Sequence, residues 1–247
     1  MSEIGAPSRV LEGRVILVTG AGQGLGRAAA LAFAVQGATV VLLGRTVAKL
    51  EAVYDEIVQA GGPQPAILPA DLAAAQDRDF EALAQAIAGQ LGRLDGILHC
   101  ANALATLSPL SQQTTEQWLT QFRVNTLAPF AINRVCLPLL TRSPDASVIL
   151  IGETHGHAPA AYWGGYAVSK AALEAYFRVQ ADEWADLVNL RINLVIPGPI
   201  HTPFRYRTHP AEDKSTLPPP EALCPLLVEL MGPQGRQTRG QLIAFRP

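Results

Sequence analysis

Two kinds of segment alternate along this chain of 247 residues. Short aliphatic or β-branched runs predict strands, and longer segments with apolar residues spaced three and four apart predict helices. The predicted strands cover residues 14–19, 39–43, 66–69, 96–100, 147–151, 189–196 and 241–245. The predicted helices cover about 24–36, 46–60, 76–91, 114–141, 166–186 and 219–231.

The predicted strands are apolar on both faces, which is typical of a parallel sheet covered by helices on both sides. Right-handed crossovers then predict an α/β fold, a single doubly wound Rossmann domain with a seven-stranded parallel sheet, over residues 1–247. Neither a repeat nor a linker divides the sequence. Residues 197–220, rich in proline and charge, are expected to form a mobile substrate loop over the carboxyl edge of the sheet.

Composition narrows the classes of function. Apolar residues make up 49% of the chain and charged residues 16%, which suits a packed core and argues against a disordered chain. A net charge of −2 gives no reason to expect nucleic acid as a partner. The three cysteines, Cys100, Cys136 and Cys224, are far apart and lack metal-ligand spacing, so we expect reduced thiols and no metal.

The sequence also predicts a cytoplasmic protein that does not bind a membrane. The first residues, MSEIGAPSRVLEGR, lack the apolar core of a signal peptide. The richest apolar stretch, 28–43, is interrupted by Gln36 and Gly37 and is too short to cross a bilayer.

A glycine-rich segment, TGAGQGLG at 19–26, directly follows the first predicted strand and opens the first helix. The pattern Gly-x-Gly-x-x-Gly fails because Leu25 occupies its third glycine position. Glycines let the backbone approach a pyrophosphate, and the free N–H groups of a helix N-terminus face its charge. We therefore predict a dinucleotide site; the alternative is a strand–helix turn that merely needs glycines. The residues that fit Thr-Gly-x-x-x-Gly-x-Gly are Thr19, Gly20, Gly24 and Gly26.

The end of the second predicted strand bears on the choice of cofactor. It reads Gly44-Arg45-Thr46, without the acidic residue that would bind the ribose of NAD. Arg45 suits the 2′-phosphate of NADP, so NADP is favoured and NAD is the alternative. Otherwise, Arg45 is only a solvated residue at the start of a helix.

Tyr166 and Lys170 are four residues apart on a predicted helix and therefore share a face. A tyrosine with a pKa of about 10 is a poor base near neutral pH. A nearby ammonium, with the positive charge of a nicotinamide ring beside it, favours the phenolate and would lower that pKa. The phenol could then exchange a proton with a substrate oxygen while a hydride moves to or from carbon. Such pairs are common by chance, but this one follows the fifth predicted strand of a chain that carries the glycine-rich segment.

Several ordered motifs make the sequence resemble the short-chain dehydrogenase/reductase family from about residue 11 to 245. The resemblance implies a Rossmann fold, hydride transfer between NAD(P)H and a carbonyl or alcohol, and a homodimer or homotetramer. The segments LDGILHCAN and YWGGYAVSK are further similar to YciK-like bacterial oxidoreductases. The motifs are TGAGQGLG at 19–26, Asp71 in PADL, HCAN at 99–102, Asn125, YAVSK at 166–170 and PGPIHT at 197–202.

The resemblance also implies roles for single residues. Asp71 and Leu72 would lie near the adenine, Ala101 and Asn102 near the ribose, and residues 197–202 near the nicotinamide. The expected catalytic residues are Asn125, Glu153, Tyr166 and Lys170. The expected cofactor-binding residues are Thr19, Gly20, Gln23, Gly24, Leu25, Gly26, Arg45, Asp71, Leu72, Ala101, Asn102, Tyr166, Lys170, Pro197, Gly198, Ile200 and Thr202.

Three positions need separate comment. Asn125 would hold the water that links Lys170 to bulk solvent; the alternative is a polar kink in an apolar helix. Asn102 stands where the family has glycine, a tolerable change because asparagine accepts a positive φ. His99 stands where the family has asparagine, and we expect it to brace neighbouring strands and not to act in catalysis.

The most serious departure is Glu153, which stands thirteen residues before Tyr166, where the family has serine. The serine donates a hydrogen bond to the substrate oxygen. An ionised glutamate cannot donate one, and its charge would raise the pKa of Tyr166. Alternatively, Glu153 is a protonated donor, pairs with His155, His157 or a cationic substrate, or faces solvent. The sequence thus favours an enzyme with an atypical site over an NADP(H)-binding sensor or scaffold without turnover.

Two further expectations concern surfaces. The long predicted helices, 114–141 and 166–186, are expected to mediate association, and otherwise the small residues of the second pack only on the sheet. Those residues are Ala171, Ala172 and Ala175, next to Tyr176. Tyr162, Trp163 and Phe204 indicate an apolar substrate pocket. Three cationic residues either attract an anion or keep a loop solvated: Arg205, Arg207 and His209.

Overall fold

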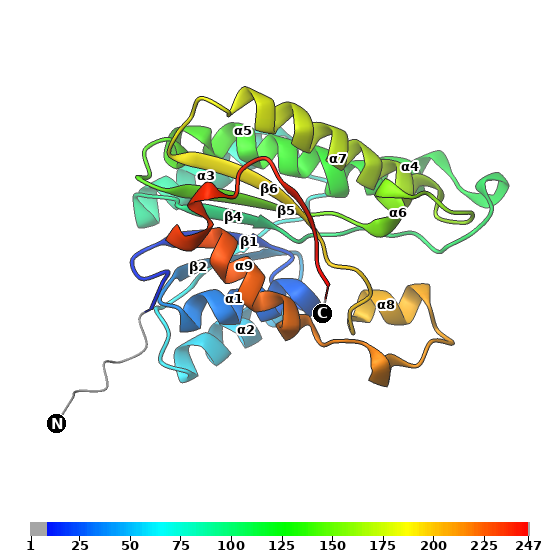
Figure 1. Ribbon diagram of the computed structural model, residues 1–247, viewed down its shortest axis with the longest axis horizontal. Coiled ribbons are helices and arrows are strands. Elements are labelled where there is room, and N and C mark those ends of the chain that lie inside the picture. Colours follow the sequence, from blue (N-terminus) through cyan, green and yellow to red (C-terminus); the bar gives the residue numbers. More distant parts are fainter. Residues whose placement is uncertain (1–8, 247) are drawn as a thin grey trace.

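Seven strands form one sheet in the order β3-β2-β1-β4-β5-β6-β7 (Figure 1). The structure, a computed structural model, describes residues 9–246. All six neighbouring strand pairs are parallel, so the predicted parallel Rossmann sheet is confirmed. The strands are β1 (Val15–Thr19), β2 (Thr39–Gly44), β3 (Ala66–Pro69), β4 (Gly96–His99), β5 (Ala146–Ile151), β6 (Leu190–Ile196) and β7 (Leu242–Ala244).

Strand β1 lies in the interior of the sheet, where the strand order reverses. Its Val18 is in register with Leu42 of β2 on one side and with Leu98 of β4 on the other. Chains that wind away from such a point in both directions leave a crevice at the carboxyl ends of the strands. The fold therefore prepares a binding site directly after β1 and β4.

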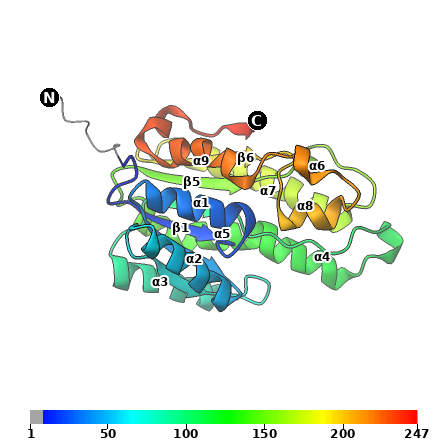
Figure 2. The same cartoon turned by 90° about the horizontal axis from the view of Figure 1, so that it is seen from below.

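Helices cover both faces of the sheet. One layer contains α1 (Gly24–Val35), α2 (Val47–Gln59) and α9 (Cys224–Met231), which Figure 2 shows from outside. The other contains α3 (Asp77–Leu91), α4 (Thr115–Phe122), α5 (Ala128–Leu140) and α7 (Gly164–Glu183). Because side chains alternate along a strand, Ile16 of β1 packs in the first layer and Leu17 in the second. This double burial explains why the strands are apolar on both faces.

The helix predicted over 114–141 is interrupted. A π-helical turn, Arg123–Leu127, separates α4 from α5 and contains Asn125. Pro129 has no N–H to donate to the carbonyl four residues earlier, which belongs to Asn125. The side chain of Asn125 bonds instead to the backbone of Ala103, and its amide donates to Ser169 Oγ at 3.0 Å. Such π-helical turns occur frequently at functional sites.

The segment 197–220 is not the uniform loop that its composition predicts. It contains α8 (Pro203–Thr208) and a 3₁₀ turn, Lys214–Thr216. Thr202 Oγ1 accepts from the N–H of Arg205 at 3.3 Å, and Pro203 occupies the first helical position, where its missing N–H costs nothing. An ion pair between Arg205 and Glu212 closes the segment at 2.6 Å. Its predicted mobility stays a prediction.

Short elements complete the fold. The sequence did not predict α6 (Thr154–His157) or the 3₁₀ turns Leu110–Gln112 and Pro233–Gln237. The last predicted helix begins as a 3₁₀ turn, Pro220–Leu223, before α9. Within residues 9–246, no helix is both long and apolar enough to cross a membrane. The single domain predicted over 1–247 stays a prediction, and its first eight residues, which include most of the segment examined for a signal peptide, lie outside the described residues, as does residue 247.

Candidate active site

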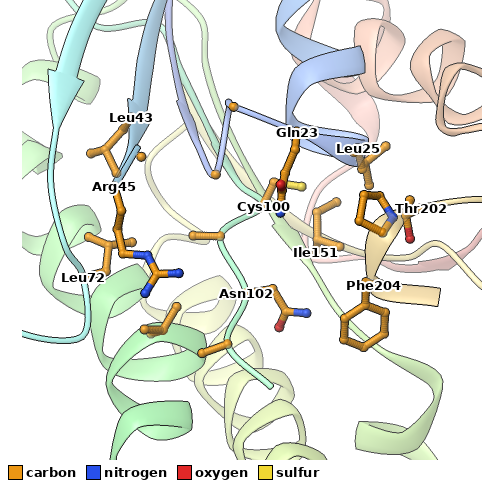
Figure 3. A pocket seen from close by; sticks show the side chains of 18 of the residues that line it. Gln23, Leu25, Leu43, Arg45, Leu72, Cys100, Asn102, Ile151, Thr202 and Phe204 are labelled. Carbon is orange, nitrogen blue, oxygen red and sulfur yellow. The ribbon is translucent and has the colours of Figure 1, made fainter. Parts of the chain in front are cut away.

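A cavity of about 370 Å³ opens at the carboxyl ends of the strands, after β1 and β4. Figure 3 shows Arg45 and Leu72 at one end of it and Thr202 and Phe204 at the other, with Asn102 between them. Doubly wound sheets bind their ligands at this place. The cavity is therefore the candidate active site.

Most of the predicted site residues line this cavity, although they come from widely separated parts of the sequence. Thr19, Gly26 and Asn125 are the exceptions and do not line it. The predicted residues that line it are Gly20, Gln23, Gly24, Leu25, Arg45, Asp71, Leu72, Ala101, Asn102, Glu153, Tyr166, Lys170, Pro197, Gly198, Ile200 and Thr202.

The glycine-rich turn has a shape that only glycine allows. Gly20 and Gly24 have φ values of +70° and +55°. A Cβ on Gly20 would lie 2.9 Å from Cα of Ala101, and a Cβ on Gly26 would collide with the carbonyl oxygen of Gly20. Thr19 Oγ1 accepts from the N–H groups of residues 100 and 101 at 3.1 and 3.0 Å. Packing thus explains Gly20 and Gly26, and both Gly20 and Gly24 line the cavity.

This turn fits the pyrophosphate of a dinucleotide. Gly24 and Leu25 begin α1 and line the cavity, and the first N–H groups of a helix have no acceptor within the helix. The positive end of the α1 dipole adds to this preference for a negatively charged group.

Lys49 was missed by the sequence analysis. It lies in the first turn of α2, lines the same cavity as Arg45, and donates from Nζ to Gln23 Oε1 at 2.6 Å. Within the described part of the chain, neither Lys49 nor Arg45 forms an ion pair with a carboxylate. The available signal was a second basic residue four positions after Arg45.

Tyr166 and Lys170 lie one turn apart on α7, and both are buried. Asn102 donates from Nδ2 to the phenol oxygen of Tyr166 at 3.1 Å. Asn102 does not adopt the positive φ that we expected, since among residues 9–246 Tyr162 is the only non-glycine residue that does. Its side chain supports the phenol instead. Lys170 donates from Nζ to the carbonyl of Ile151 at 2.9 Å and lies 6.0 Å from the centre of the Tyr166 ring.

Burial dominates the electrostatics of this pair. Burial raises the pKa of Tyr166 well above its usual value, the charge of Glu153 raises it further, and the bond from Asn102 acts in the opposite direction. Burial also lowers the pKa of Lys170 to about 8, although the negative charge of Glu153 acts to raise it. The expected effect of Glu153 on the phenol is therefore present. In the protein without its cofactor burial dominates and the pKa of Tyr166 is raised, so the lowering expected from Lys170 and a bound nicotinamide together stays a prediction.

Glu153 lies between β5 and α6 and lines the cavity. Its Oε1 is 3.2 Å from Nδ1 of His155, whose ring stacks on Trp163 with centroids 3.7 Å apart. His157 pairs with Glu174 at 3.2 Å, outside this group. Among the alternatives from the sequence, the structure favours the pair with His155 over a side chain turned to solvent.

An aromatic cluster forms the wall around Tyr166. The rings of Trp163 and Phe204 lie 5.7 and 5.5 Å from that of Tyr166, and Leu104 and Leu107 pack against the cluster. Phe204 thus gives the substrate end of the cavity an apolar side chain, beside the polar groups of Asn102, Glu153 and Tyr166. Neither Tyr162, which is exposed, nor Trp163, which is buried beside Tyr166, lines the cavity, so of the three residues predicted for the apolar pocket only Phe204 does.

The three cationic residues of segment 197–220 have different surroundings. Arg205 pairs with Glu212, and His209 approaches the Thr208 hydroxyl at 2.9 Å. Arg207 lines the cavity and donates to the carbonyl of Leu104 at 2.9 Å. Only Arg207 therefore brings an unpaired charge to the cavity from this segment within the described residues.

His99 does not line the cavity. Its Nε2 is 2.8 Å from Oδ1 of Asn133, whose amide donates to the Tyr176 hydroxyl at 2.8 Å. Burial lowers the pKa of His99 to about 4, so the ring is neutral near neutral pH. Through Asn133, its side chain joins β4 to α5 and α7 without bracing a neighbouring strand; that it takes no part in catalysis stays a prediction.

Comparison with known proteins identifies the family. The sequence profile of the short chain dehydrogenase family matches residues 14–213. The uncharacterized oxidoreductase YciK of Escherichia coli is 39% identical over 238 residues, which cover 96% of this chain and 94% of YciK.

Solved structures agree with this result. A protein from Shigella flexneri, described as a short chain dehydrogenase and complexed with NADP, has a TM-score of 0.94 and 37% identity over 98% of this chain and 100% of that one. Another from Escherichia coli, complexed with NADPH, has a TM-score of 0.93 and 38% identity over 98% and 100% of the two chains. By sequence and by structure, the chain belongs to the short-chain dehydrogenase/reductase family.

Proposed function

We propose that this protein is an NADP(H)-preferring oxidoreductase with an atypical active site in which Glu153 replaces the serine of the family. The observation that carries the proposal is the shared cavity. Tyr166, Lys170 and Glu153 line it together with the glycine-rich turn and Arg45. A site without turnover needs neither a buried phenol nor a buried ammonium next to a dinucleotide turn, and burying both groups is costly.

A dinucleotide would lie along the cavity with its adenosine half at one end and its nicotinamide half at the other. Arg45, Asp71 and Leu72 would hold its adenosine half, and the N–H groups of Gly24 and Leu25 its pyrophosphate. Residues 197–202, Tyr166 and Lys170 would surround the nicotinamide half. Bound there, the nicotinamide would supply or accept a hydride at the substrate carbon. The structures of relatives that contain NADP and NADPH support this assignment.

Preference for NADP over NAD follows from the charges at the adenosine end. Arg45 and Lys49 are exposed cations that line this end, and Lys49 reaches across to Gln23. A charge-assisted bond to the 2′-phosphate is worth about 1.5–3 kcal/mol, or roughly ten- to a hundred-fold in affinity. NADH lacks this phosphate and would gain nothing from either residue.

At the other end, Tyr166 would hold or move a proton at its phenol oxygen. Asn102 donates to that oxygen and thereby favours the phenolate, and a protonated Lys170 would act in the same direction. The carbonyl of Asn125 lacks its α-helical donor because Pro129 follows four residues later. This carbonyl can accept from a water that leads protons from Lys170 to solvent, whereas the Asn125 side chain positions Ala103 and Ser169.

The rival proposal is an NADP(H)-binding sensor or scaffold that no longer turns over. Steady-state NADPH consumption against a panel of aldehydes, ketones and imines, with a parallel cofactor titration, separates the two. Turnover of any member of the panel supports the enzyme, and for an aldehyde or ketone Tyr166→Phe should abolish it. Tight NADPH binding without consumption on any member of the panel supports the rival.

Assembly and location complete the proposal. We propose a homodimer or homotetramer formed through α4, α5 and α7, since the described structure exposes apolar side chains there. They are Leu119, Phe130, Val168 and Val179, together with Leu127 in the π-helical turn between α4 and α5. A cytoplasmic location stays a prediction, and it agrees with the free thiols of Cys100, Cys136 and Cys224.

A further inference from the structure

The polar groups at the substrate end of the cavity do not suit a carbonyl oxygen. Glu153 occupies the position from which the family's serine donates, and a carboxylate only accepts hydrogen bonds. One N–H of Asn102 is bound to the phenol of Tyr166 and one N–H of Lys170 to the carbonyl of Ile151, so the hydroxyl of Tyr166 is the donor in this group that has no such bond among residues 9–246. A carbonyl oxygen that gains negative charge during reduction would therefore be repelled by Glu153.

The same arrangement suits a positively charged group. Within residues 9–246, Glu153 has no lysine or arginine partner, and its recorded ionic contact is the imidazole of His155 at 3.2 Å. Its side chain lies in a largely buried place, where the attraction between opposite charges is stronger than at an open surface. The rings of Tyr166 and Phe204 line the same end, and aromatic faces attract cations.

We infer that the substrate of this oxidoreductase is a cationic C=N compound, an iminium ion, or in the reverse direction the corresponding amine, held by the carboxylate of Glu153. This inference rests on the proposed function and names the substrate class of that same site. The nitrogen, with its N–H, would occupy the place of the carbonyl oxygen, so that Glu153 accepts where the family's serine donates.

The reaction balances without a proton from the protein. The iminium carbon receives a hydride from the reduced nicotinamide, the π pair of C=N becomes the lone pair of nitrogen, and the neutral amine takes a proton from water after release. The substrate is reduced by two electrons and the nicotinamide is oxidised by two. Tyr166 need not act as an acid, which agrees with its raised pKa. In this reaction the phenol positions the substrate nitrogen.

The other cations near the cavity do not contradict this arrangement. Arg205 is neutralised by Glu212, and Arg207 is exposed and bound to the carbonyl of Leu104. Lys170, whose pKa burial lowers to about 8, is still mostly protonated near neutral pH, but its Nζ donates to the carbonyl of Ile151 and forms no ion pair with Glu153 among the described residues. The carboxylate therefore remains available to a cation from the substrate.

Binding without turnover tests the charge directly. Titration calorimetry on the protein–NADP⁺ complex would compare pyrrolidine, which is protonated near neutral pH, with cyclopentanol, which has a similar ring and no charge. We expect the amine to bind roughly ten- to a hundred-fold more tightly, the usual effect of a charge-assisted bond. Glu153→Gln keeps the shape and removes the charge, so it should abolish this preference and leave NADP⁺ affinity within about twofold. Glu174→Gln is the matched control, because Glu174 pairs with His157 and Arg178 outside the cavity and should leave the preference unchanged.

Turnover provides the second test, with dihydroisoquinoline as the imine and tetralone as the ketone. The wild type should favour the imine, and Glu153→Ser should reverse the order. The added donor should speed ketone reduction by up to about a hundred- to a thousand-fold, with Glu153→Gln between the two.

Results that differ from these expectations would overturn the inference in the following ways. Equal affinity for amine and alcohol overturns the inference, and so does a wild type that reduces tetralone and loses that activity in Glu153→Ser; the proposed oxidoreductase function survives both. If NADPH binds but no variant reduces either compound, and the amine shows no preference, both the inference and the enzymatic function fail.

Discussion

The ammonium of Lys170 donates a hydrogen bond to the carbonyl oxygen of Ile151, 2.9 Å away, at the last residue of β5. A buried side chain of α7 is thus fixed to the end of the sheet, directly beside the cavity. Tyr166 precedes it by one helical turn, and its phenol has a different partner, Asn102. Tyr166 and Lys170 share one face of α7 but have different partners, so their substitutions should have different effects.

Tyr166→Phe should lower turnover by about a hundred- to ten-thousand-fold, the usual contribution of a proton-transferring group, for substrates that need a proton. NADPH affinity should stay within about twofold, because the phenol contributes little to cofactor binding. Lys170→Ala should reduce both turnover and affinity, since Lys170 also fixes the cavity wall. Initial rates and fluorescence titration with NADPH would measure the two effects. Full carbonyl reduction by Tyr166→Phe would refute the proposed chemistry.

Arg45→Ala and Lys49→Ala should each weaken NADPH binding by up to about ten- to a hundred-fold and leave NADH binding unchanged. The reason is that only NADPH carries the 2′-phosphate. Titration of both cofactors against each variant measures the difference, and Arg78→Ala, an exposed arginine of α3 outside the cavity, is the control. Equal affinity of the wild type for NADH and NADPH would contradict the preference.

The strands and most helices could be predicted because their signal is local. Each strand is a short run that is apolar on both faces, and each predicted strand lies within about two residues of the observed one. The cavity could be located because its residues follow β1, β2, β4 and β5 directly. Sequence order alone therefore brings Gly20, Arg45, Asn102 and Glu153 to one edge of the sheet.

The remaining features depend on contacts between distant residues. The bond from Asn102 to Tyr166 joins residues 64 positions apart, and the bond from Lys49 to Gln23 spans 26. The π-helical turn at Asn125 depends on bonds to Ala103 and Ser169 that periodicity does not reveal. The direction of the Tyr166 pKa could not be predicted because the cost of burying the phenol is set by the complete surrounding structure.

His99 should make the protein less stable in mild acid. Its pKa is about 4 when folded and about 6.5 in an unfolded chain, so between these values the unfolded state binds more protons. The free energy of unfolding should therefore rise with pH from 4 to 6.5, by on the order of 3 kcal/mol from this residue. Urea unfolding at several pH values would measure the slope. His99→Asn should flatten it, and an equal slope in both proteins would contradict the assignment to His99.

Association through α4, α5 and α7 should give at least a dimer in light scattering at micromolar concentration. Burying the exposed apolar side chains on these helices supplies the driving force. Val168→Glu and Val179→Glu on α7 should weaken association, since each would place a charge in the interface. Val188→Glu is the control, because Val188 is exposed in the loop after α7. A monomeric mass for the wild type would end this proposal.

The largest single loss of stability is expected far from the cavity, at the amino ends of the strands. Asp145 accepts from Arg14 at 2.8 Å and pairs with Arg191, and all three side chains are largely buried. Asp145→Asn would leave two buried guanidinium groups without this counter-charge, and Nε of each already has no hydrogen-bond partner among residues 9–246. Removing one partner of a buried ion pair costs about 3–5 kcal/mol, because the remaining charge stays desolvated.

An exposed ion pair provides the comparison for this prediction. Asp77 pairs with Arg134 at 2.9 Å, and its side chain is 73% exposed, so Asp77→Asn should cost less than about 1 kcal/mol. Urea unfolding of both variants measures the difference, and similar small losses would show that the Asp145 cluster contributes little. Because the cluster and the cavity lie at opposite ends of the strands, the folded Asp145→Asn protein should keep the NADPH affinity of the wild type. A lower affinity in the folded variant would show that the two ends of the sheet are coupled.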